Sequence, residues 1–253
     1  MKEIISFKNG SRFCFSVKEN NLRDFYKKAI EINEYKNIES DTLIELRLDY
    51  LVNKKCDLKE LIETINKIKK QTKDRQYIAT LRNFQSGGNC LVDAKEYFEI
   101  VSEIYKNTKV DGIDIDYDMY QKKSKLYDKL FDKKKTVILS FINKVDKFSR
   151  EEYVDLYKKM LKTSANGIKV VTKAISFLDM ENLMESAKDS KDLFEANNKF
   201  SIFISTGRLG LTSRVHYEYT NTKIIYLDAY PFNPIPDGEI DREHFDKCRK
   251  QMK

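Results

Sequence analysis

Residues 136–172 read TVILSFINKVDKFSREEYVDLYKKMLKTSANGIKVVT and contain one strand–helix–strand unit. A β-rich run over Thr136–Phe141 is followed by Ser149-Arg150-Glu151-Glu152, which has the pattern of a capping box at the start of a helix. Apolar residues then recur with helical period on one face: Tyr153, Leu156, Tyr157, Met160 and Leu161. A second β-rich run covers Gly167–Thr172. Two short strands joined by an amphipathic helix indicate parallel strands in an α/β fold.

This unit repeats along the chain, because short β-rich runs alternate with longer stretches of helical period. The predicted strands cover Arg12–Val17, Thr42–Asp49, Gln76–Arg82, Gly112–Tyr117, Thr136–Phe141, Gly167–Thr172, Phe200–Thr206 and Lys223–Ala229. The predicted helices lie near residues 21–35, 57–71, 92–107, 119–133, 150–163, 178–197, 211–219 and 241–252. Eight βα units in 253 residues match the size and order of a (β/α)8 TIM barrel. We therefore predict a single TIM-barrel domain over residues 1–253.

An open, doubly wound sheet is the alternative architecture. Such a sheet usually has fewer strands and a glycine-rich first turn, whereas this chain has eight glycines and no GxGxxG or Walker A pattern. The chain also contains no linker or low-complexity segment that would divide it. The barrel is therefore the simpler interpretation.

The composition excludes several classes of protein. With 41% hydrophobic and 34% charged residues, the chain has the balance of a soluble globular protein. The formal net charge of +7 comes largely from lysine runs such as Lys133-Lys134-Lys135. Such runs are usually solvated helix ends, so we expect no nucleic-acid partner. The same positive charge suits a small anionic substrate.

Cysteine and histidine usage bears on metal binding and on location. Four widely separated cysteines, no CxxC motif and two histidines argue against a metal site, and they suit the reduced thiols of a cytosolic protein. The first residues lack the apolar region of a signal peptide, and no apolar run approaches membrane-spanning length. We therefore expect a cytoplasmic protein with no membrane partner.

Lys169 is the most informative single residue, because it lies inside the apolar run Gly167-Ile168-Lys169-Val170-Val171-Thr172. On an edge strand, its side chain would extend to water. In an enclosed site, desolvation would favour the uncharged amine, which can attack a carbonyl carbon. The strand pattern by itself leaves both interpretations open.

Charged residues recur on other predicted strands with period two. In Ile44-Glu45-Leu46-Arg47-Leu48-Asp49 the charged residues share one face, and in Ile113-Asp114-Ile115-Asp116 the two aspartates do the same. Arg82 closes a further strand. Helices cover the outside of a parallel barrel, so these charges must face its lumen or rim. There they should pair with each other or with a ligand, and we predict a site for a polar anionic molecule that carries a carbonyl.

Five segments in order resemble the motifs of the type I 3-dehydroquinate dehydratases. They are Glu45-Leu46-Arg47-Leu48-Asp49 (E-x-R-x-D), Arg82 with Gly87-Gly88 (R-x4-G-G), Asp114-Ile115-Asp116 (D-x-E with the glutamate shortened), Gly167-Ile168-Lys169, and Gly207-Arg208-Leu209-Gly210-Leu211-Thr212-Ser213-Arg214 (G-x-x-G-x-x-S-R). The resemblance runs over nearly the whole chain. It implies a TIM barrel, often dimeric, that converts 3-dehydroquinate to 3-dehydroshikimate and water in the shikimate pathway, with no metal or cofactor.

The resemblance also implies roles for individual residues. Lys169 would form an imine with the substrate ketone, and Arg214 would bind the substrate carboxylate through a bidentate pair. The remaining candidate substrate-binding residues are Ser16, Glu45, Arg47, Arg82 and Glu239. Asp116 is a candidate base or orienting carboxylate. A small anionic keto acid is the expected substrate, and a homodimer is expected.

The chain departs from the family pattern at the proton-transfer residue. The fifth strand of the family ends S-x-H-D, and its histidine is the general acid/base. Here the segment is Ser140-Phe141-Ile142-Asn143, so Ile142 stands at the histidine position. The family's closing P-G-Q loop is also altered, to Pro236-Asp237-Gly238-Glu239. General acid–base catalysis contributes about 10²–10⁴-fold, so its loss would slow the reaction without necessarily abolishing it.

Several residues are candidates to replace the histidine. His216 and His244 are predicted on helices and are more typical of surface or packing positions. Glu45, Asp116 and Glu239 are carboxylates that burial could tune for proton transfer. Two alternative functions therefore stay open: another imine-forming lyase or aldolase that acts on a different keto acid, and a non-catalytic paralogue that binds a metabolite.

Overall fold

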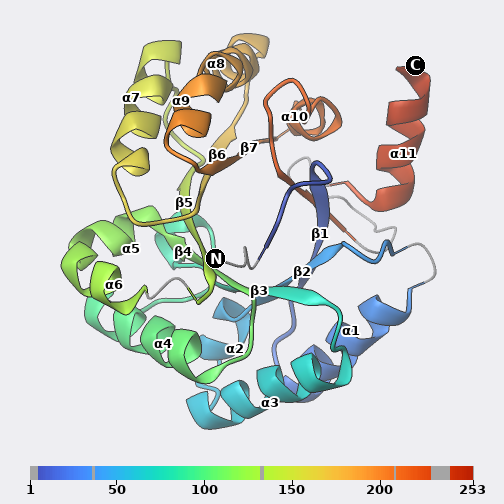
Figure 1. Ribbon diagram of the computed structural model, residues 1–253, viewed down its shortest axis with the longest axis vertical. Coiled ribbons are helices and arrows are strands. Elements are labelled where there is room, and N and C mark those ends of the chain that lie inside the picture. The colour runs from blue at the N-terminus through green and yellow to red at the C-terminus, as the bar shows by residue number, and fades with distance from the viewer. Residues whose placement is uncertain (1–4, 36–37, 132–133, 208, 229–239, 253) are drawn as a thin grey trace. The chain divides into compact units, whose positions relative to one another are not determined.

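The computed structural model describes residues 5–35, 38–131, 134–207, 209–228 and 240–252. Eight strands form one sheet in the order β7-β6-β5-β4-β3-β2-β1-β8 (Figure 1). They are β1 (Arg12–Val17), β2 (Leu43–Arg47), β3 (Gln76–Leu81), β4 (Gly112–Asp116), β5 (Thr136–Asn143), β6 (Gly167–Lys173), β7 (Phe200–Thr206) and β8 (Ile224–Leu227). The β1–β2, β2–β3, β3–β4 and β6–β7 pairs are parallel.

The two ends of this strand order are also joined. The N–H of Lys223, just before β8, donates to the carbonyl of Ser201 on β7 at 2.9 Å, and the neighbouring Thr222 forms a parallel bridge with Ser201. On the other side, the N–H of Arg12 on β1 donates to the carbonyl of Lys223 at 2.9 Å. The architecture is therefore a (β/α)8 TIM barrel, and the predicted fold class is confirmed.

Helices alternate with the strands. They are α1 (Leu22–Glu34), α2 (Asp49–Val52), α3 (Leu58–Gln71), the 3₁₀ helix η1 (Phe84–Ser86), α4 (Ala94–Asn107), α5 (Tyr117–Lys122), α6 (Ser124–Leu130), α7 (Arg150–Leu161), α8 (Phe177–Asp189), α9 (Lys191–Ala196), α10 (Gly210–Val215) and α11 (Arg242–Gln251).

Helix α7 follows the pattern read from the sequence. Ser149 accepts a hydrogen bond from the N–H of Glu152, and the Glu152 carboxylate accepts one from the N–H of Ser149 at 2.7 Å. The predicted capping box is thus present, and it satisfies two backbone donors at the start of the helix. All five residues predicted on the apolar face of α7 are buried.

Two segments that were each predicted as one helix form two helices in the structure. The expected helix at 119–133 is divided into α5 and α6 at Lys123, whose backbone has φ −139° and ψ 26°. Tyr120 on α5 stacks on Tyr127 of α6 across this break, with ring centroids 5.7 Å apart. The expected helix at 178–197 is divided into α8 and α9 at the buried Ser190, beyond which Phe194 packs against Phe203 of β7. Aromatic packing therefore overrides a helical period that runs through both breaks.

Other predicted boundaries were also wrong, by fewer residues. The second strand ends at Arg47, because Asp49 begins the short helix α2, and the fourth ends at Asp116, because Tyr117 begins α5. Helix α10 ends at Val215 and not near residue 219. Residue 229, at the end of the predicted eighth strand, lies outside the described residues.

The chain divides into two compact units, and each is described separately below. Unit 1 comprises the described parts of Met1–Ser6 and Cys14–Leu139, and unit 2 comprises those of Phe7–Phe13 and Ser140–Lys253. In unit 1, α1, α3 and α4 each bury one apolar face. In unit 2, Tyr157, Phe194 and Phe203 form an aromatic cluster with ring centroids 5.0–5.9 Å apart, which joins α7 and α9 to β7. The single domain expected over residues 1–253 remains a prediction.

None of the described helices has the length and hydrophobicity needed to span a bilayer. Within the same part of the chain, no group of three or more His, Cys, Asp or Glu side chains is arranged to hold a metal ion.

Candidate functional site

Arg82 is the centre of a buried charge cluster in unit 1. Its Nη2 donates to Asp114 Oδ1 at 2.7 Å, and its Nη1 donates to Asp116 Oδ1. The N–H of Asn83 donates to the second oxygen of Asp116 at 2.6 Å. All three charged side chains are almost completely buried. The prediction that the strand charges pair with each other is therefore confirmed for Arg82 and the two aspartates of β4.

The electrostatics of this cluster reflect one cation shared by two carboxylates. Burial alone would lower the pKa of Arg82, but the charges of Asp114 and Asp116 raise it well above its ordinary value. Burial raises the pKa of Asp116, and the opposing effects of Arg82 and the Asn83 N–H do not cancel it, because Asp114 shares the same guanidinium. Asp116 is therefore committed to an ion pair as well as being a candidate for proton transfer.

The Gly87-Gly88 segment folds a tight turn back onto Arg82. Gly87 has φ +74°, a conformation that glycine adopts at little cost. A Cβ on Gly88 would lie 2.2 Å from the carbonyl oxygen of Arg82, so only glycine fits there. The N–H of Cys90 then donates to that carbonyl at 3.2 Å. The glycine pair of the motif thus holds the backbone of Arg82 in place.

Glu45 lies on β2 between two hydroxyl donors. Ser16 Oγ on β1 donates to its Oε2 at 2.5 Å, and Thr80 Oγ1 on β3 donates to its Oε1 at 2.8 Å. Ser16 and Glu45 are also register partners in the sheet. The structure therefore joins two of the predicted substrate-binding residues, Ser16 and Glu45, and adds Thr80 to them.

Arg47 forms a bidentate pair with Asp49. Its Nε donates to Oδ1 at 2.8 Å and its Nη2 to Oδ2 at 2.9 Å. The N–H of Asn89 also donates to Oδ2 of Asp49, at 3.0 Å, which ties the start of α2 to the turn that follows Arg82. Burial alone would lower the pKa of Arg47, but the hydrogen bonds and charge of Asp49 raise it above its ordinary value.

Lys169 in unit 2 is buried on β6, with 6% of its surface exposed. Its Nζ lies 3.8 Å from the centroid of the Tyr226 ring on β8. This burial excludes the interpretation of Lys169 as an edge-strand lysine that extends to water. Gly167, two residues earlier, is required because a Cβ there would lie 2.2 Å from the ring of Phe200 on β7. The Gly-Ile-Lys motif thus combines a packing constraint with a buried amine.

Arg214 is buried on α10 and donates mainly to backbone oxygens. Its Nη1 donates to the carbonyls of Ser205 and Gly210 at 3.0 and 3.1 Å, and its Nε donates to the carbonyl of Tyr226 at 3.3 Å. Its neighbour Ser213 accepts from the N–H of Ser205 at 2.8 Å. Ser213 and Arg214 of the G-x-x-G-x-x-S-R segment are therefore held by hydrogen bonds to β7 and β8.

Residues Phe141, Ile142 and Asn143, where the resemblance places the family's histidine, are half-buried at the end of β5. Phe141 packs edge-on against Phe148 with ring centroids 5.7 Å apart. Asn143 accepts from the N–H groups of Val145 and Asp146, both at 2.8 Å, and donates to the Asp146 carboxylate. Ile142 lies between these two structural residues and has no group that can transfer a proton.

The two histidines lie elsewhere in unit 2. His244 is on α11, where its Nδ1 lies 2.5 Å from Asp241 Oδ2 and half of its side chain is exposed. His216 is the C-terminal cap residue of α10. Both positions agree with the packing and surface roles expected from the sequence. Glu239, the last predicted substrate-binding residue, lies outside the described residues.

Sequence reasoning missed Tyr226 and Thr80. Each is a polar residue between apolar neighbours on a predicted strand, in Ile225-Tyr226-Leu227 and Ala79-Thr80-Leu81. The two-residue period that identified Glu45 and Asp114 would have identified both, had it been applied to hydroxyl-bearing residues as well as to charged ones.

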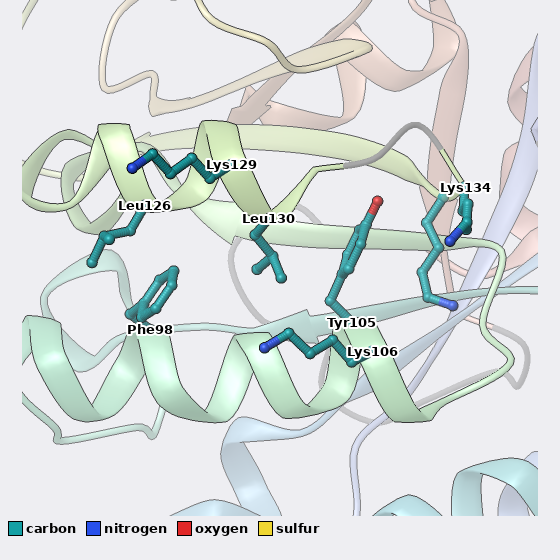
Figure 2. A pocket seen from close by; sticks show the side chains of 8 residues that line it. Phe98, Tyr105, Lys106, Leu126, Lys129, Leu130 and Lys134 are labelled. Carbon is teal, nitrogen blue, oxygen red and sulfur yellow. The ribbon is translucent and has the colours of Figure 1, made fainter.

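A hollow of about 550 Å³ lies away from all these residues, between α4 and α6 of unit 1 (Figure 2). Apolar side chains from both helices form its floor, and lysines surround it: Phe98, Tyr105, Lys106, Leu126, Lys129, Leu130, Lys134 and Lys135. One of the lysines, Lys135, donates to the carbonyl of Thr108 at 2.7 Å. No residue predicted for the site lines this hollow.

Comparison with known proteins agrees with the motifs. A sequence model of the family described as type I 3-dehydroquinase matches residues 13–231. A 3-dehydroquinate dehydratase from Streptococcus pyogenes serotype M5 (strain Manfredo) is 29% identical over 187 residues, which cover 74% of this chain and 75% of that protein.

Solved structures of similar fold cover nearly the whole chain. A type I 3-dehydroquinate dehydratase from Clostridium difficile, solved with covalently modified comenic acid, has a TM-score of 0.83 at 20% identity and covers 96% of this chain and 92% of that one. A 3-dehydroquinate dehydratase from Enterococcus faecalis has a TM-score of 0.81 at 17% identity, with coverage of 96% and 94%. At these identities the structures support the fold alone.

Proposed function

The chain belongs to the type I 3-dehydroquinase family, and on this premise we propose that it dehydrates 3-dehydroquinate to 3-dehydroshikimate through an imine on Lys169. The observation that carries the proposal is the burial of Lys169 on β6 beside the Tyr226 ring. An amine held in a buried site can form a covalent imine with a ketone that binds beside it.

The imine makes the dehydration possible. The lone pair of the Lys169 nitrogen attacks the ketone carbon, and loss of water from the resulting carbinolamine gives an iminium ion. This cation withdraws electrons, so the adjacent C–H can release its proton and form an enamine. The nitrogen lone pair of the enamine then re-forms an iminium ion while the C=C pair shifts to form the new double bond of the product, and the hydroxyl group on the next carbon takes up a proton and leaves as water. Hydrolysis of the second iminium ion releases the product and restores the lysine.

The other predicted residues would bind the substrate. Arg214 is the proposed partner of the substrate carboxylate, and its bonds to the carbonyls of Ser205, Gly210 and Tyr226 support this role by fixing the guanidinium in one orientation. Glu45, with its two hydroxyl donors, is the proposed partner of a substrate hydroxyl group. The substrate contacts expected of Ser16, Arg47, Arg82 and Glu239 also remain proposals.

Borohydride trapping tests this function directly. The protein is incubated with 3-dehydroquinate and sodium borohydride, and the modified peptide is identified by mass spectrometry, while the formation of 3-dehydroshikimate is followed by absorbance without borohydride. An adduct on Lys169 together with turnover is the expected result. Absence of any adduct would contradict the proposed imine.

A second candidate is an imine-forming lyase or aldolase that acts on another keto acid. It is supported by the expectation, drawn from the resemblance, that Ile142 stands at the position of the family's histidine. It predicts an adduct on Lys169 with 3-dehydroquinate but no turnover, and turnover with a different keto acid. A non-catalytic metabolite-binding paralogue would bind 3-dehydroquinate with no adduct.

We also propose a cytoplasmic location and a homodimer. All four cysteines are free thiols, which supports a reducing compartment. Sedimentation of the purified protein at several concentrations tests the homodimer, since a dimer should have twice the mass of the 29.9 kDa chain.

A further inference from the structure

We propose that the hydroxyl group of Tyr226 is the proton-transfer group for the imine chemistry at Lys169. This inference rests on the function proposed above and deepens it, because it assigns the step for which position 142 offers only an isoleucine.

The geometry brings Tyr226 to the reacting nitrogen. Tyr226 lies in the middle of β8, where its neighbours Ile225 and Leu227 are buried on the opposite face of the strand. Its ring centroid is 3.8 Å from Lys169 Nζ, and its hydroxyl oxygen is buried. The carbons that an imine adds to Nζ are one and two bonds away from that nitrogen. The phenol oxygen, at the edge of the ring beneath Nζ, is therefore close to the C–H and C–O bonds that react.

The backbone of Tyr226 is also held in place. Its carbonyl accepts a hydrogen bond from Arg214 Nε at 3.3 Å. The same residue therefore contacts the proposed nucleophile through its ring and the proposed carboxylate-binding arginine through its backbone. A substrate bound between Lys169 and Arg214 would lie beside the phenol.

Two side chains of unit 2, a histidine and the residue after position 142, do not supply this step: His244 pairs with Asp241 on α11, and Asn143 at the end of β5 carries an amide, which transfers no proton. A phenol has the required chemistry, because its oxygen can both donate and accept a proton.

The proton can be followed through the whole cycle. The Tyr226 O–H gives its proton to the carbinolamine hydroxyl, which leaves as water, and the phenolate then faces the iminium ion. The phenolate removes the proton of the adjacent C–H, and that bonding pair forms the enamine. The O–H next protonates the departing substrate hydroxyl; the enamine C=C pair shifts to form the new C=C bond, and the nitrogen lone pair forms the second iminium ion. Finally, water attacks the second iminium ion and gives a proton to the phenolate. Release of the product then restores both the tyrosine and the lysine.

The charge of the intermediate favours this sequence. A phenol is a weak acid with an ordinary pKa of about 10, so forming phenolate near neutral pH is unfavourable in water. The iminium ion places a permanent positive charge on the nitrogen that lies over the ring, and a close opposite charge stabilises an anion. The phenolate is therefore present only in the steps in which an iminium ion on Lys169 lies beside it.

Tyr226→Phe tests the proposal, because it removes the hydroxyl and retains the ring under Lys169. The matched control is Tyr153→Phe, which removes a buried hydroxyl of the same unit that bonds to Thr172 Oγ1 at 2.7 Å. Wild type and both variants are assayed for turnover of 3-dehydroquinate, for borohydride adduct on Lys169, and for exchange of the substrate's α-hydrogen in deuterium oxide. Thermal unfolding is measured in parallel to show that each variant folds.

The expected result separates imine formation from proton transfer. Tyr226→Phe should retain the Lys169 adduct and lose about 10²-fold or more in both turnover and α-hydrogen exchange, the usual contribution of a general acid–base group. Tyr153→Phe should keep both rates within about twofold of wild type. Tyr226→Phe rates that match wild type would overturn the role of Tyr226 and leave the proposed function standing. A wild-type adduct with neither exchange nor turnover would also overturn it, whereas absence of a wild-type adduct would overturn the proposed function and this inference with it.

Discussion

The charge cluster of unit 1 and the lysine site of unit 2 stabilise buried cations in different ways. Arg82 and Arg47 bind aspartates through short charge-assisted hydrogen bonds. Lys169 lies over an aromatic ring, and Arg214 donates to three backbone carbonyls. A carboxylate cancels the charge of its partner, whereas a ring or a carbonyl stabilises a cation without adding a negative charge.

The difference distinguishes the charge cluster of unit 1, whose ion pairs stabilise the fold, from the lysine site of unit 2, whose cations are proposed to act on a substrate. A buried arginine between two aspartates is fixed, because its removal leaves both carboxylates without a cation. The contacts that Lys169 and Arg214 make with a ring and with backbone carbonyls add no negative charge where an anionic substrate would bind. The predictions below change one member of each region and compare the outcomes.

The largest effect is expected at the nucleophile. Lys169→Met should abolish the borohydride adduct and lower turnover by on the order of 10⁴-fold or more, since it removes the amine on which the proposed imine forms. The matched control is Lys173→Met, which removes an exposed lysine from the same strand and should leave activity unchanged. Steady-state kinetics and intact-mass analysis after trapping measure both variants. An adduct that persists in Lys169→Met would place the imine on another lysine.

In unit 1, the largest expected effect is on stability. Arg82→Met leaves Asp114 and Asp116 buried without their cation and should destabilise the fold by about 3–5 kcal/mol. The control is Arg150→Met, which breaks the exposed pair with Asp189 and should cost about 0–1 kcal/mol. Urea unfolding followed by circular dichroism measures both. If the Arg82 variant does not fold, Arg82→Lys, which retains the charge but loses the forked geometry, should fold with reduced stability. Equal losses for Arg82→Met and Arg150→Met would show that the buried cluster adds no more than a surface pair.

The features that could be predicted from the sequence are those that depend on the local spacing of residues along one strand or helix. Alternation placed Glu45, Asp114 and Asp116 on the lumen side of their strands, and the capping box placed the start of α7 at Ser149. The sequence also predicted that buried strand charges would pair, but the choice of Asp114 and Asp116 for Arg82 depends on the register between β3 and β4.

Features that depend on distant packing could not be predicted. The break at Lys123 follows from the stacking of Tyr120 on Tyr127, which no helical period encodes. The contact between Lys169 and Tyr226 joins β6 to β8, two strands that are separated by β7 in the chain. The two-residue period could place Tyr226 on the face of its strand opposite Ile225 and Leu227, but it could not place the ring beside Lys169.

Restoring the family's histidine sharpens the assignment in unit 2. Ile142→His should raise turnover of wild type by about tenfold, which is less than the usual contribution of an acid–base group because Tyr226 already transfers the proton. In a Tyr226→Phe background the same substitution should raise turnover by about 10²-fold, since the two groups would be alternatives. Steady-state kinetics of the four proteins give the coupling. Equal gains in both backgrounds would show that the histidine and the phenol act independently.

The smallest expected effect concerns the charge state of the unit 1 cluster. Burial raises the pKa of Asp116 in the folded protein above its ordinary value of 3.8, so between pH 3.8 and the folded pKa the folded state binds more protons than the unfolded state. The contribution of Asp116 to the free energy of unfolding is therefore fully present below pH 3.8 and is lost as pH rises through the folded pKa. The free energy of unfolding should fall by at most about 1.4 kcal/mol per pH unit over this range.

Asp116→Asn removes this pH dependence, although it also weakens the bond to Arg82 at every pH. Urea unfolding of wild type and variant from pH 4 upward in steps of about half a unit compares the two slopes. If the free energy of unfolding of wild type falls with pH no more steeply than that of the variant, Arg82 holds both aspartates ionised. The cluster would then be a fully charged triad.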